Sequence, residues 1–238
     1  MRSDDPEARI HDIAELRERV HVFRDRAHAG EVLAGMLEKY RGSNAIVLAI
    51  PAGGVPVATE IATRLGLALD VVPASKVLFP WTTESGFGAV AFDGTEWLNE
   101  ESIRRFGLDV ETVRVATEQA RDKVRRRLGK FRGDRPLPRL QGRDSLLVDD
   151  GIAAGSTMRA AVLALEKAGA GKIIIAIPTA HDTALYPLAQ TADAIFCANV
   201  RSGLSFAVAD AYRRWTDVSE DEVMDILAQL HSDTDAIT

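Results

Sequence analysis

Short apolar runs in this chain alternate with segments whose apolar residues recur every three or four positions, which is typical of strands alternating with amphipathic helices. The clearest unit begins with a predicted buried strand, Ser145–Val148, followed by a loop of small residues over 151–157. Apolar positions then form one helical stripe over 158–168, and Gly169 is placed to end that helix. The apolar run 172–177 predicts a second strand. The unit is therefore βαβ, with parallel strands.

The rest of the chain repeats this alternation. An aspartate, Asp25, is placed to cap the first helix, and Ser219 with Glu222 has the spacing of a capping box before the last helix. The pattern predicts strands over 44–50, 69–74 and 194–198, and helices over 23–40, 57–65 and 109–128. These elements predict an α/β fold: a parallel twisted sheet with helices on both faces.

Candidate chemistry lies at the end of the strand Ser145–Val148. Two carboxylates, Asp149 and Asp150, follow this strand, and the carboxyl ends of parallel strands form the crevice where such sheets bind ligands. The loop that follows can turn backbone N–H groups toward an anion at a helix N-terminus. Anion donors beside two acids that accept hydrogen bonds suit a ribose phosphate. The alternative is an ordinary strand-to-helix turn in which the acids cap the helix.

Composition restricts the function classes. The chain has 238 residues, 46% of them hydrophobic and 27% charged, which suits one soluble globular domain. No apolar run approaches the roughly 20 residues of a membrane span, and the charged N-terminus lacks the apolar core of a signal peptide. A single cysteine, Cys197, excludes a disulfide framework. We therefore expect a cytoplasmic protein, and the net charge of −6 argues against general nucleic-acid binding.

The segment VDDGIAAGSTM closely resembles the phosphoribosyl-diphosphate (PRPP) signature of type I phosphoribosyltransferases. The resemblance implies that Asp149 and Asp150 hold the ribose hydroxyls. It also implies that a loop cradles the 5′-phosphate, formed by Ala153, Ala154, Gly155, Ser156 and Thr157. Ala154 replaces a frequent threonine, and Ser156 is the candidate substitute for its hydroxyl. The family's Mg²⁺ would be held chiefly by substrate oxygens and water, with the two aspartates as further candidates.

A second loop, Ala52-Gly53-Gly54, follows the strand 44–50, where this family places its diphosphate-binding loop. Glycine lets the backbone approach an anion closely. The similar branch of the family usually reads PRGGVPVA, so Ala52 replaces an expected arginine. Lys76 matches a lysine that ends the next strand in that branch, although a plain surface lysine is an equal alternative. The similar segment FRDRAHAG contains Arg24 and Arg26, which either decorate a helix start or bind ligand.

The resemblance also implies a domain plan for the whole chain, residues 1–238. The core covers about 40–200, a small hood comes from about 1–40 and 200–238, and a lid or helical insertion covers about 77–140. Residues 77–107 are expected to be mobile and to exclude water from the reacting sugar. The arginine run 125–127 favours a solvated helix face, with a phosphate or partner surface as the alternative.

The expected function is transfer of the phosphoribosyl group from PRPP to a nitrogenous acceptor, with diphosphate released. Such an enzyme would use Asp149, Asp150 and Lys76 at the reacting centre. The partners expected are PRPP and a small-molecule acceptor, and a homodimer is left open. Ala153 stands where 6-oxopurine enzymes usually carry an acid, so we expect neither hypoxanthine nor guanine as acceptor. The alternative is a regulator that binds PRPP without catalysing transfer.

Overall fold

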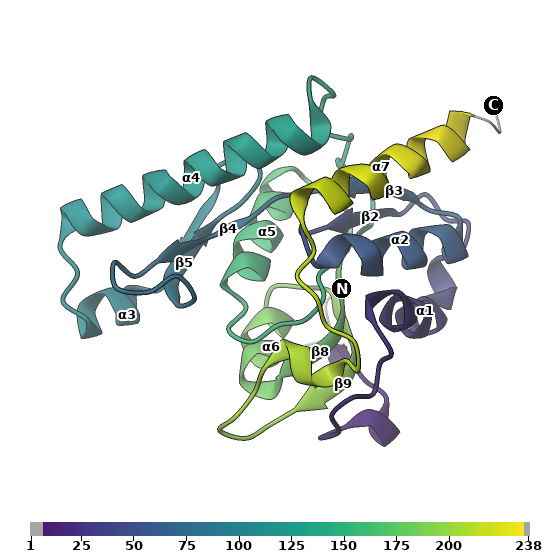
Figure 1. The fold of residues 1–238 in the computed structure, drawn as a ribbon, viewed down its shortest axis with the longest axis horizontal. Coiled ribbons are helices and arrows are strands. Elements are labelled where there is room, and N and C mark those ends of the chain that lie inside the picture. The colour runs from purple at the N-terminus through teal and green to yellow at the C-terminus, as the bar shows by residue number, and fades with distance from the viewer. Residues whose placement is uncertain (1–6, 236–238) are drawn as a thin grey trace.

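The centre of the molecule is a six-stranded parallel sheet, seen in a computed structural model that describes residues 7–235 and side chains up to residue 230 (Figure 1). All neighbouring strands pair in parallel, in the order β1-β9-β8-β7-β2-β3. The strands are β1 (Ile10–His11), β2 (Ile46–Ala49), β3 (Ala68–Val71), β7 (Ser145–Val148), β8 (Ile173–His181) and β9 (Ala194–Arg201). The predicted α/β fold is confirmed.

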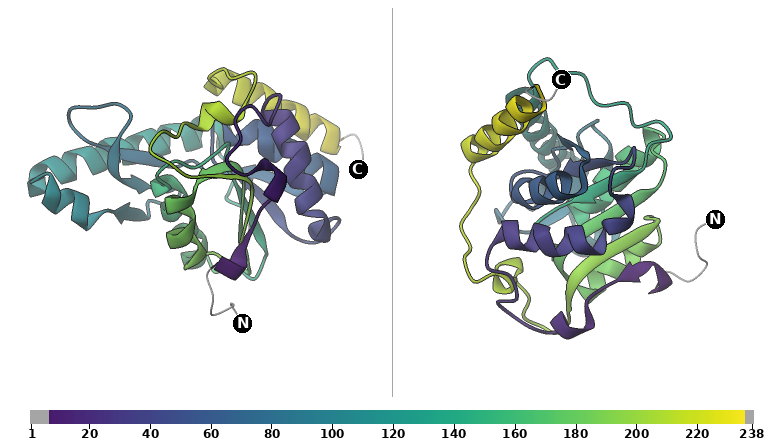
Figure 2. Two further views of the ribbon diagram at one scale, coloured as in Figure 1. Left: turned by 90° about the horizontal axis from the view of Figure 1, so that it is seen from below. Right: turned by 90° about the vertical axis from the view of Figure 1, so that its right-hand side faces the viewer.

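Helices cover both faces of this sheet, because alternate side chains of each strand point to opposite sides. In β7, Leu146 packs in one apolar cluster and Leu147 in the other. The first face carries α1 (Arg26–Met36) and α2 (Gly54–Leu65), with α7 (Glu220–Asp235) packed on α2, as the right-hand view of Figure 2 shows. The second face carries α5 (Ser156–Lys167) and α6 (Asp182–Ala189). Short 3₁₀ turns complete the core: η1 (Glu7–Arg9), η2 (Ala14–Leu16), η3 (Glu38–Tyr40) and η4 (Val208–Ala211).

Two predicted helix starts are confirmed in detail. The Asp25 side chain accepts a hydrogen bond from the backbone N–H of His28 at 3.0 Å, which satisfies one free donor at the start of α1. The Ser219 hydroxyl accepts from the N–H of Glu222 at 3.1 Å, just before α7. Both caps lie where the polar residue precedes the apolar stripe.

Residues 75–132 form a separate projection that we call the arm (Figure 1). It contains a three-stranded antiparallel sheet under a long helix, with its own small apolar cluster. Its elements are β4 (Ser75–Leu78), β5 (Gly86–Val90), β6 (Glu96–Leu98), α3 (Glu100–Arg105) and α4 (Val110–Arg132). The sequence predicted an insertion here but no second sheet, because its glycines and Pro80 interrupt the strand pattern.

The predicted strand over 69–74 is wrong at its end, since β3 stops at Val71. The chain leaves the core sheet there and enters the arm, so Lys76 lies in β4 and pairs with Ala89 of β5. Lys76 therefore belongs to the arm and does not end a core strand. An apolar run continuing from one sheet into another reads as one strand in the sequence.

The predicted hood also differs from the structure. β1 extends the core sheet by pairing with β9, and α1 packs against β8 and β9, so both belong to the core. Residues 17–25 and 202–216 do lie together beside the sheet, joined by a bridge between Phe23 and Tyr212. Residues 1–6 and 236–238, assigned to the hood from the sequence, lie outside the described residues.

Within residues 7–235, none of the helices combines the length and the apolar character needed to cross a membrane.

Candidate active site

The acid pair lies where the sequence predicts, directly after β7 at the carboxyl edge of the sheet. Asp149 accepts a hydrogen bond on Oδ1 from the backbone N–H of Asp150 at 2.9 Å. The backbone carbonyl of Asp150 accepts one from the Tyr212 hydroxyl at 2.6 Å. The pair is thus fixed from both sides of the turn and is only partly exposed.

The predicted phosphate loop follows at once. Ile152 pairs with β8 through two backbone hydrogen bonds, to Thr179 and from His181, each 3.0 Å long. β8 itself continues past Pro178, where the sequence predicted its end, because residues 179–181 pair with residues 199–201 of β9. The side chains of Ala153 and Ala154 are exposed, so only backbone and small groups border the space above them.

The loop ends at the N-terminus of α5. Gly155 has the positive φ of 77° and occupies the N-cap without any side-chain cap. Ser156 and Thr157 begin the helix, and Ser156 is 8% exposed. A helix start that lacks a capping side chain can accept an anion instead, because its first N–H groups need an acceptor.

The second glycine loop packs directly against the acid pair. A Cβ on Gly53 would overlap Asp150 Oδ2, and a Cβ on Gly54 would lie 2.7 Å from the carbonyl oxygen of Val148 and 2.9 Å from Asp149 Cα. Gly54 begins α2, and the peptide bond from Pro51 to Ala52 is cis. The two predicted loops therefore meet, and only glycine permits the contact.

The structure adds a residue whose role the sequence left open. Arg26, in the first turn of α1, donates from Nε to Asp150 Oδ2 at 2.8 Å and from Nη1 to the Thr216 carbonyl at 2.7 Å. Its guanidinium carbon lies 3.8 Å from the centre of the Trp215 ring. Arg26 is buried, with 8% of its surface exposed. The segment FRDRAHAG left a binding role for Arg26 open, but nothing in the sequence indicated its partners Asp150 and Trp215.

Burial and charge give the two aspartates different electrostatics. Burial and the neighbouring Asp150 carboxylate raise the pKa of Asp149 well above its usual range. Burial also raises the pKa of Asp150, but the Arg26 guanidinium opposes that rise by stabilising the charged form. Asp150 therefore has a cationic partner in contact, whereas Asp149 makes no ion pair among the described residues.

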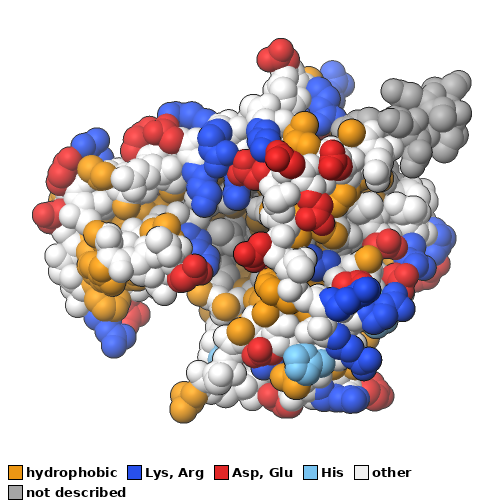
Figure 3. Space-filling view, viewed as in Figure 1, with side chains coloured by type: hydrophobic (Ala, Val, Ile, Leu, Met, Phe, Trp, Pro, Cys, Tyr) orange, Lys and Arg blue, Asp and Glu red, His pale blue; other side chains and the backbone are white. Residues whose placement is uncertain are grey.

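One lysine of the arm, Lys76, acts electrostatically on the acid pair, and Lys123 lies near Lys76. The charge of Lys76 on β4 lowers the pKa of Asp149, although burial and Asp150 raise it more strongly, and Lys76 Nζ donates to the Glu84 carbonyl at 3.1 Å. Burial, then Arg127, Arg126 and Lys76, lower the pKa of Lys123 on α4. Lys123 has no ion-pair partner among residues 7–230. Figure 3 shows the surface hollowed between α4 and the body, with Lys and Arg side chains gathered where α4 borders the hollow.

The arginine run of α4 is tied to α7. Arg126 and Arg127 donate to Glu220 at 2.9 and 3.0 Å, and Lys130 contacts Asp221 at 2.8 Å. We call these five residues the clasp. Hydrogen bonds from Arg126 and then Arg127 lower the pKa of Glu220 to about 2. Arg125, which pairs within α4, and Arg126 are both exposed, as the predicted solvated face requires, whereas Arg127 is largely covered.

The acid pair fits the predicted Mg²⁺ only as a partial ligand set. Two carboxylates are fewer than the six oxygens that Mg²⁺ requires, and Asp150 Oδ2 already contacts Arg26. Among the described residues, no three His, Cys, Asp or Glu side chains gather as a metal site. Oxygens of a bound substrate and water would have to complete the coordination.

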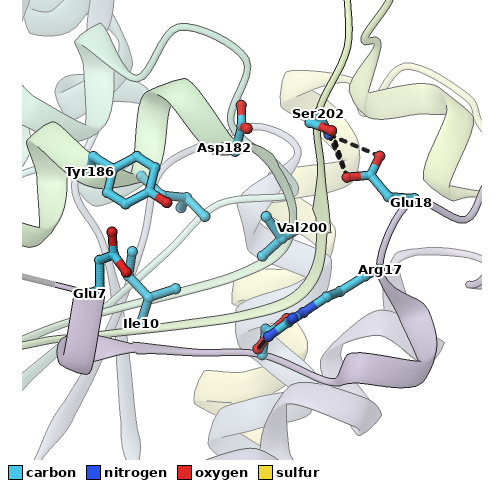
Figure 4. Close-up of a pocket in the computed structure, with 10 residues that line it drawn as sticks. Glu7, Ile10, Arg17, Glu18, Asp182, Tyr186, Val200 and Ser202 are labelled. Carbon is cyan, nitrogen blue, oxygen red and sulfur yellow. Dashed lines mark hydrogen bonds and ion pairs between the residues drawn. The ribbon is translucent and has the colours of Figure 1, made fainter.

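A separate cavity of about 370 Å³ lies between β1, β9 and α6 and contains none of the predicted site residues. Figure 4 shows Tyr186 on α6 above Ile10, with Glu18 bonded to Ser202 on the other side of the cavity. β8 lies between this cavity and the strand that carries the acid pair. The cavity is therefore distinct from the candidate active site.

Comparisons with known proteins show the family of this chain. The phosphoribosyl transferase domain family matches residues 25–211. The Mycobacterium tuberculosis protein named "Putative phosphoribosyl transferase Rv0571c" is 37% identical over 212 residues, which cover 89% of this chain and 48% of that protein. The chain thus spans about half the length of the curated relatives it matches. The crystal structure of TT1426 from Thermus thermophilus is 35% identical, with a TM-score of 0.70, and the match covers 87% of this chain and 98% of that one. The chain belongs to the phosphoribosyl transferase domain family.

Proposed function

We propose that this protein transfers the 5-phosphoribosyl group of PRPP to a nitrogenous small molecule. The observation that carries the proposal is the contact between the two glycine loops. The loop after β2 and the loop after β7 meet at the acid pair, so the proposed diphosphate and ribose-phosphate sites would lie side by side. A ligand that carries both groups on one sugar fits this arrangement.

In the proposed reaction the acceptor nitrogen bonds to C1 of the ribose as the bond from C1 to the diphosphate oxygen breaks. Diphosphate leaves with the electron pair, and the acceptor nitrogen loses its proton. The site would act by positioning and by electrostatic stabilisation, since the sugar becomes cationic while diphosphate becomes more negative. Asp149 and Asp150 would accept from the ribose hydroxyls, and the start of α5 would hold the 5′-phosphate. Bound Mg²⁺ would neutralise charge on the diphosphate.

The acceptor is proposed to be a base other than hypoxanthine or guanine. The first loop position, Ala153, is exposed and carries no acid that could assist at a 6-oxopurine ring. Robust turnover of either purine would contradict this proposal.

Diphosphate release is the direct test. We expect release from PRPP with Mg²⁺ when the correct member of a panel of nitrogenous bases is present, and loss of PRPP binding with a chelator. Calorimetry that gives equal PRPP affinity with and without the chelator would count against the site.

The second candidate function is a PRPP-binding regulator. Ala52 in the diphosphate loop favours it, since the loop lacks a cationic side chain. A regulator would bind PRPP with Mg²⁺ but release no diphosphate with any acceptor, so the same assay separates the two functions.

A further inference from the structure

The diphosphate loop lacks a cation of its own. Residues 50–54 are Ile, Pro, Ala, Gly and Gly, which offer backbone groups but no charged side chain. A diphosphate carries several negative charges, and backbone donors alone leave most of that charge uncompensated. Besides Mg²⁺, any cationic side chain that binds a diphosphate at this loop must therefore come from another part of the chain.

Arg26 is a cationic group in direct contact with the acid pair. Asp150 Oδ2 is the atom that a Cβ on Gly53 would overlap, and the same oxygen accepts from Arg26 Nε at 2.8 Å. One carboxylate oxygen thus separates the guanidinium from the loop. The residues come from distant parts of the chain, since Arg26 lies 124 positions before Asp150.

Three contacts fix the Arg26 guanidinium in place, but they do not occupy all of its hydrogen-bond donors. The Trp215 ring, the Thr216 carbonyl and Asp150 fix its plane. Its third nitrogen, Nη2, has no protein partner among the described residues. Arg132, another buried arginine, differs in this respect, because both of its terminal nitrogens bond protein oxygens. A planar guanidinium with one free donor nitrogen suits a phosphate oxygen.

We propose that Arg26 binds the diphosphate group of PRPP and supplies the cationic contact that Ala52 cannot make. The proposal rests on the proposed function of the same site. Asp150 and Trp215 act as positioning residues for this arginine. The guanidinium thus comes from α1, a helix that is not part of the diphosphate loop.

The test compares inorganic diphosphate with ribose 5-phosphate by calorimetry, both with Mg²⁺. For Arg26→Gln we expect diphosphate affinity to fall roughly 10- to 100-fold and ribose 5-phosphate affinity to change less than about threefold. Arg26→Lys should fall between, because lysine keeps the charge but loses the planar fork. Arg24→Gln is the matched control: Arg24 is exposed, and we expect no change.

Equal losses for the two ligands would show that Arg26 only supports the fold, and unchanged diphosphate affinity would overturn the proposal. Should Arg26→Gln fail to fold, the variant Arg26→Gln/Asp150→Asn removes both charges of the pair. Its diphosphate affinity must fall well below that of Asp150→Asn alone. Wild-type protein that binds neither ligand nor PRPP would refute the proposed function itself. Wild-type binding with unaffected variants would refute only the role of Arg26.

Discussion

The two halves of the candidate site are built in opposite ways. The ribose-phosphate half, residues 148–158, is one continuous turn from β7 into α5. The proposed diphosphate half would combine the loop 50–54 with Arg26 of α1 and with Lys76 and Lys123 of the arm. In the first half, local sequence determines nearly every group. In the second, the charged groups arrive from separate elements.

This difference shows which parts of a site can vary independently. A continuous loop must keep its small residues together, because each shapes the same turn. The diphosphate half is built from several elements, so it can lack the arginine expected at Ala52 and use a cation from a different helix instead. We therefore expect substitutions at the junction of the halves to be most damaging, and those on the arm to be least damaging.

The largest effect is expected for Gly54→Ala, at the junction of the two halves. The new Cβ would press on the Val148 carbonyl and on Asp149 Cα, which are backbone atoms that can move only with the end of β7. We expect PRPP affinity to fall about 100-fold or more, with a lower melting temperature, because a small displacement misaligns both loops. Gly35→Ala is the control, since a Cβ on this helical residue meets no atom within 4 Å. Retained affinity in Gly54→Ala would show that the halves are not coupled.

The acid pair is expected to give the next largest effect. Asp149→Asn and Asp150→Asn should each reduce PRPP affinity roughly 10- to 150-fold, because each removes a charged hydrogen-bond acceptor. Their effects on stability should differ. Asp150→Asn leaves the buried Arg26 without its counter-charge, so we expect a loss below the about 3–5 kcal/mol typical of fully buried pairs, since Asp150 keeps 16% exposure. Thermal unfolding measures the stability of both variants, and calorimetry measures their PRPP affinity, so together they test whether the two effects differ in this way.

Asp149→Asn should instead leave stability at pH 7 unchanged or higher. A carboxyl whose folded pKa lies above its unfolded value of 3.8 costs stability once the unfolded chain ionises, so the cost appears as pH rises above about 3.8. The variant's advantage should therefore disappear in acid. A lower melting temperature at pH 7 would show instead that the hydrogen bond from the Asp150 N–H to Asp149 Oδ1 stabilises the turn by more than the buried charge costs.

Smaller effects are expected on the arm. Lys76→Gln and Lys123→Gln should each weaken diphosphate binding about 2- to 5-fold, because exposed charges are screened by water and salt. The loss should shrink as salt concentration rises. The exposed Lys172 provides the control, and ribose 5-phosphate affinity should not change. If the loss of diphosphate affinity in these variants does not depend on salt concentration, the lysines do not interact with the diphosphate through their charge.

The clasp should have the smallest effect on binding. Glu220→Gln is expected to leave PRPP affinity within about twofold and to cost about 0.5 kcal/mol of stability. Because the folded pKa of Glu220 is about 2, the clasp contributes fully above its ordinary value of 4.5 and is lost as pH falls toward 2. Hydrogen exchange in residues 77–107 should become faster in the variant. Exchange that is already slow throughout this segment in the free wild-type protein would refute a mobile lid.

The sequence predicted the parts that depend on neighbouring residues. The strand Ser145–Val148 and the cap at Asp25 follow from local pattern and appear as expected. β1 could not be predicted, since two residues carry no periodicity. The contact between Arg26 and Asp150 depends on how α1 docks, and β3 ends where the chain changes sheet, which no local pattern records.

The attachment of Arg26 also has a consequence for protein synthesis. Its partner Thr216 lies 190 residues further along the chain, so this part of the site has a very high contact order. During translation α1 leaves the ribosome long before the segment that fixes its arginine. The α1–α2 pair and the central strands can assemble earlier, but this arginine can be locked in place only when nearly all of the described chain has emerged.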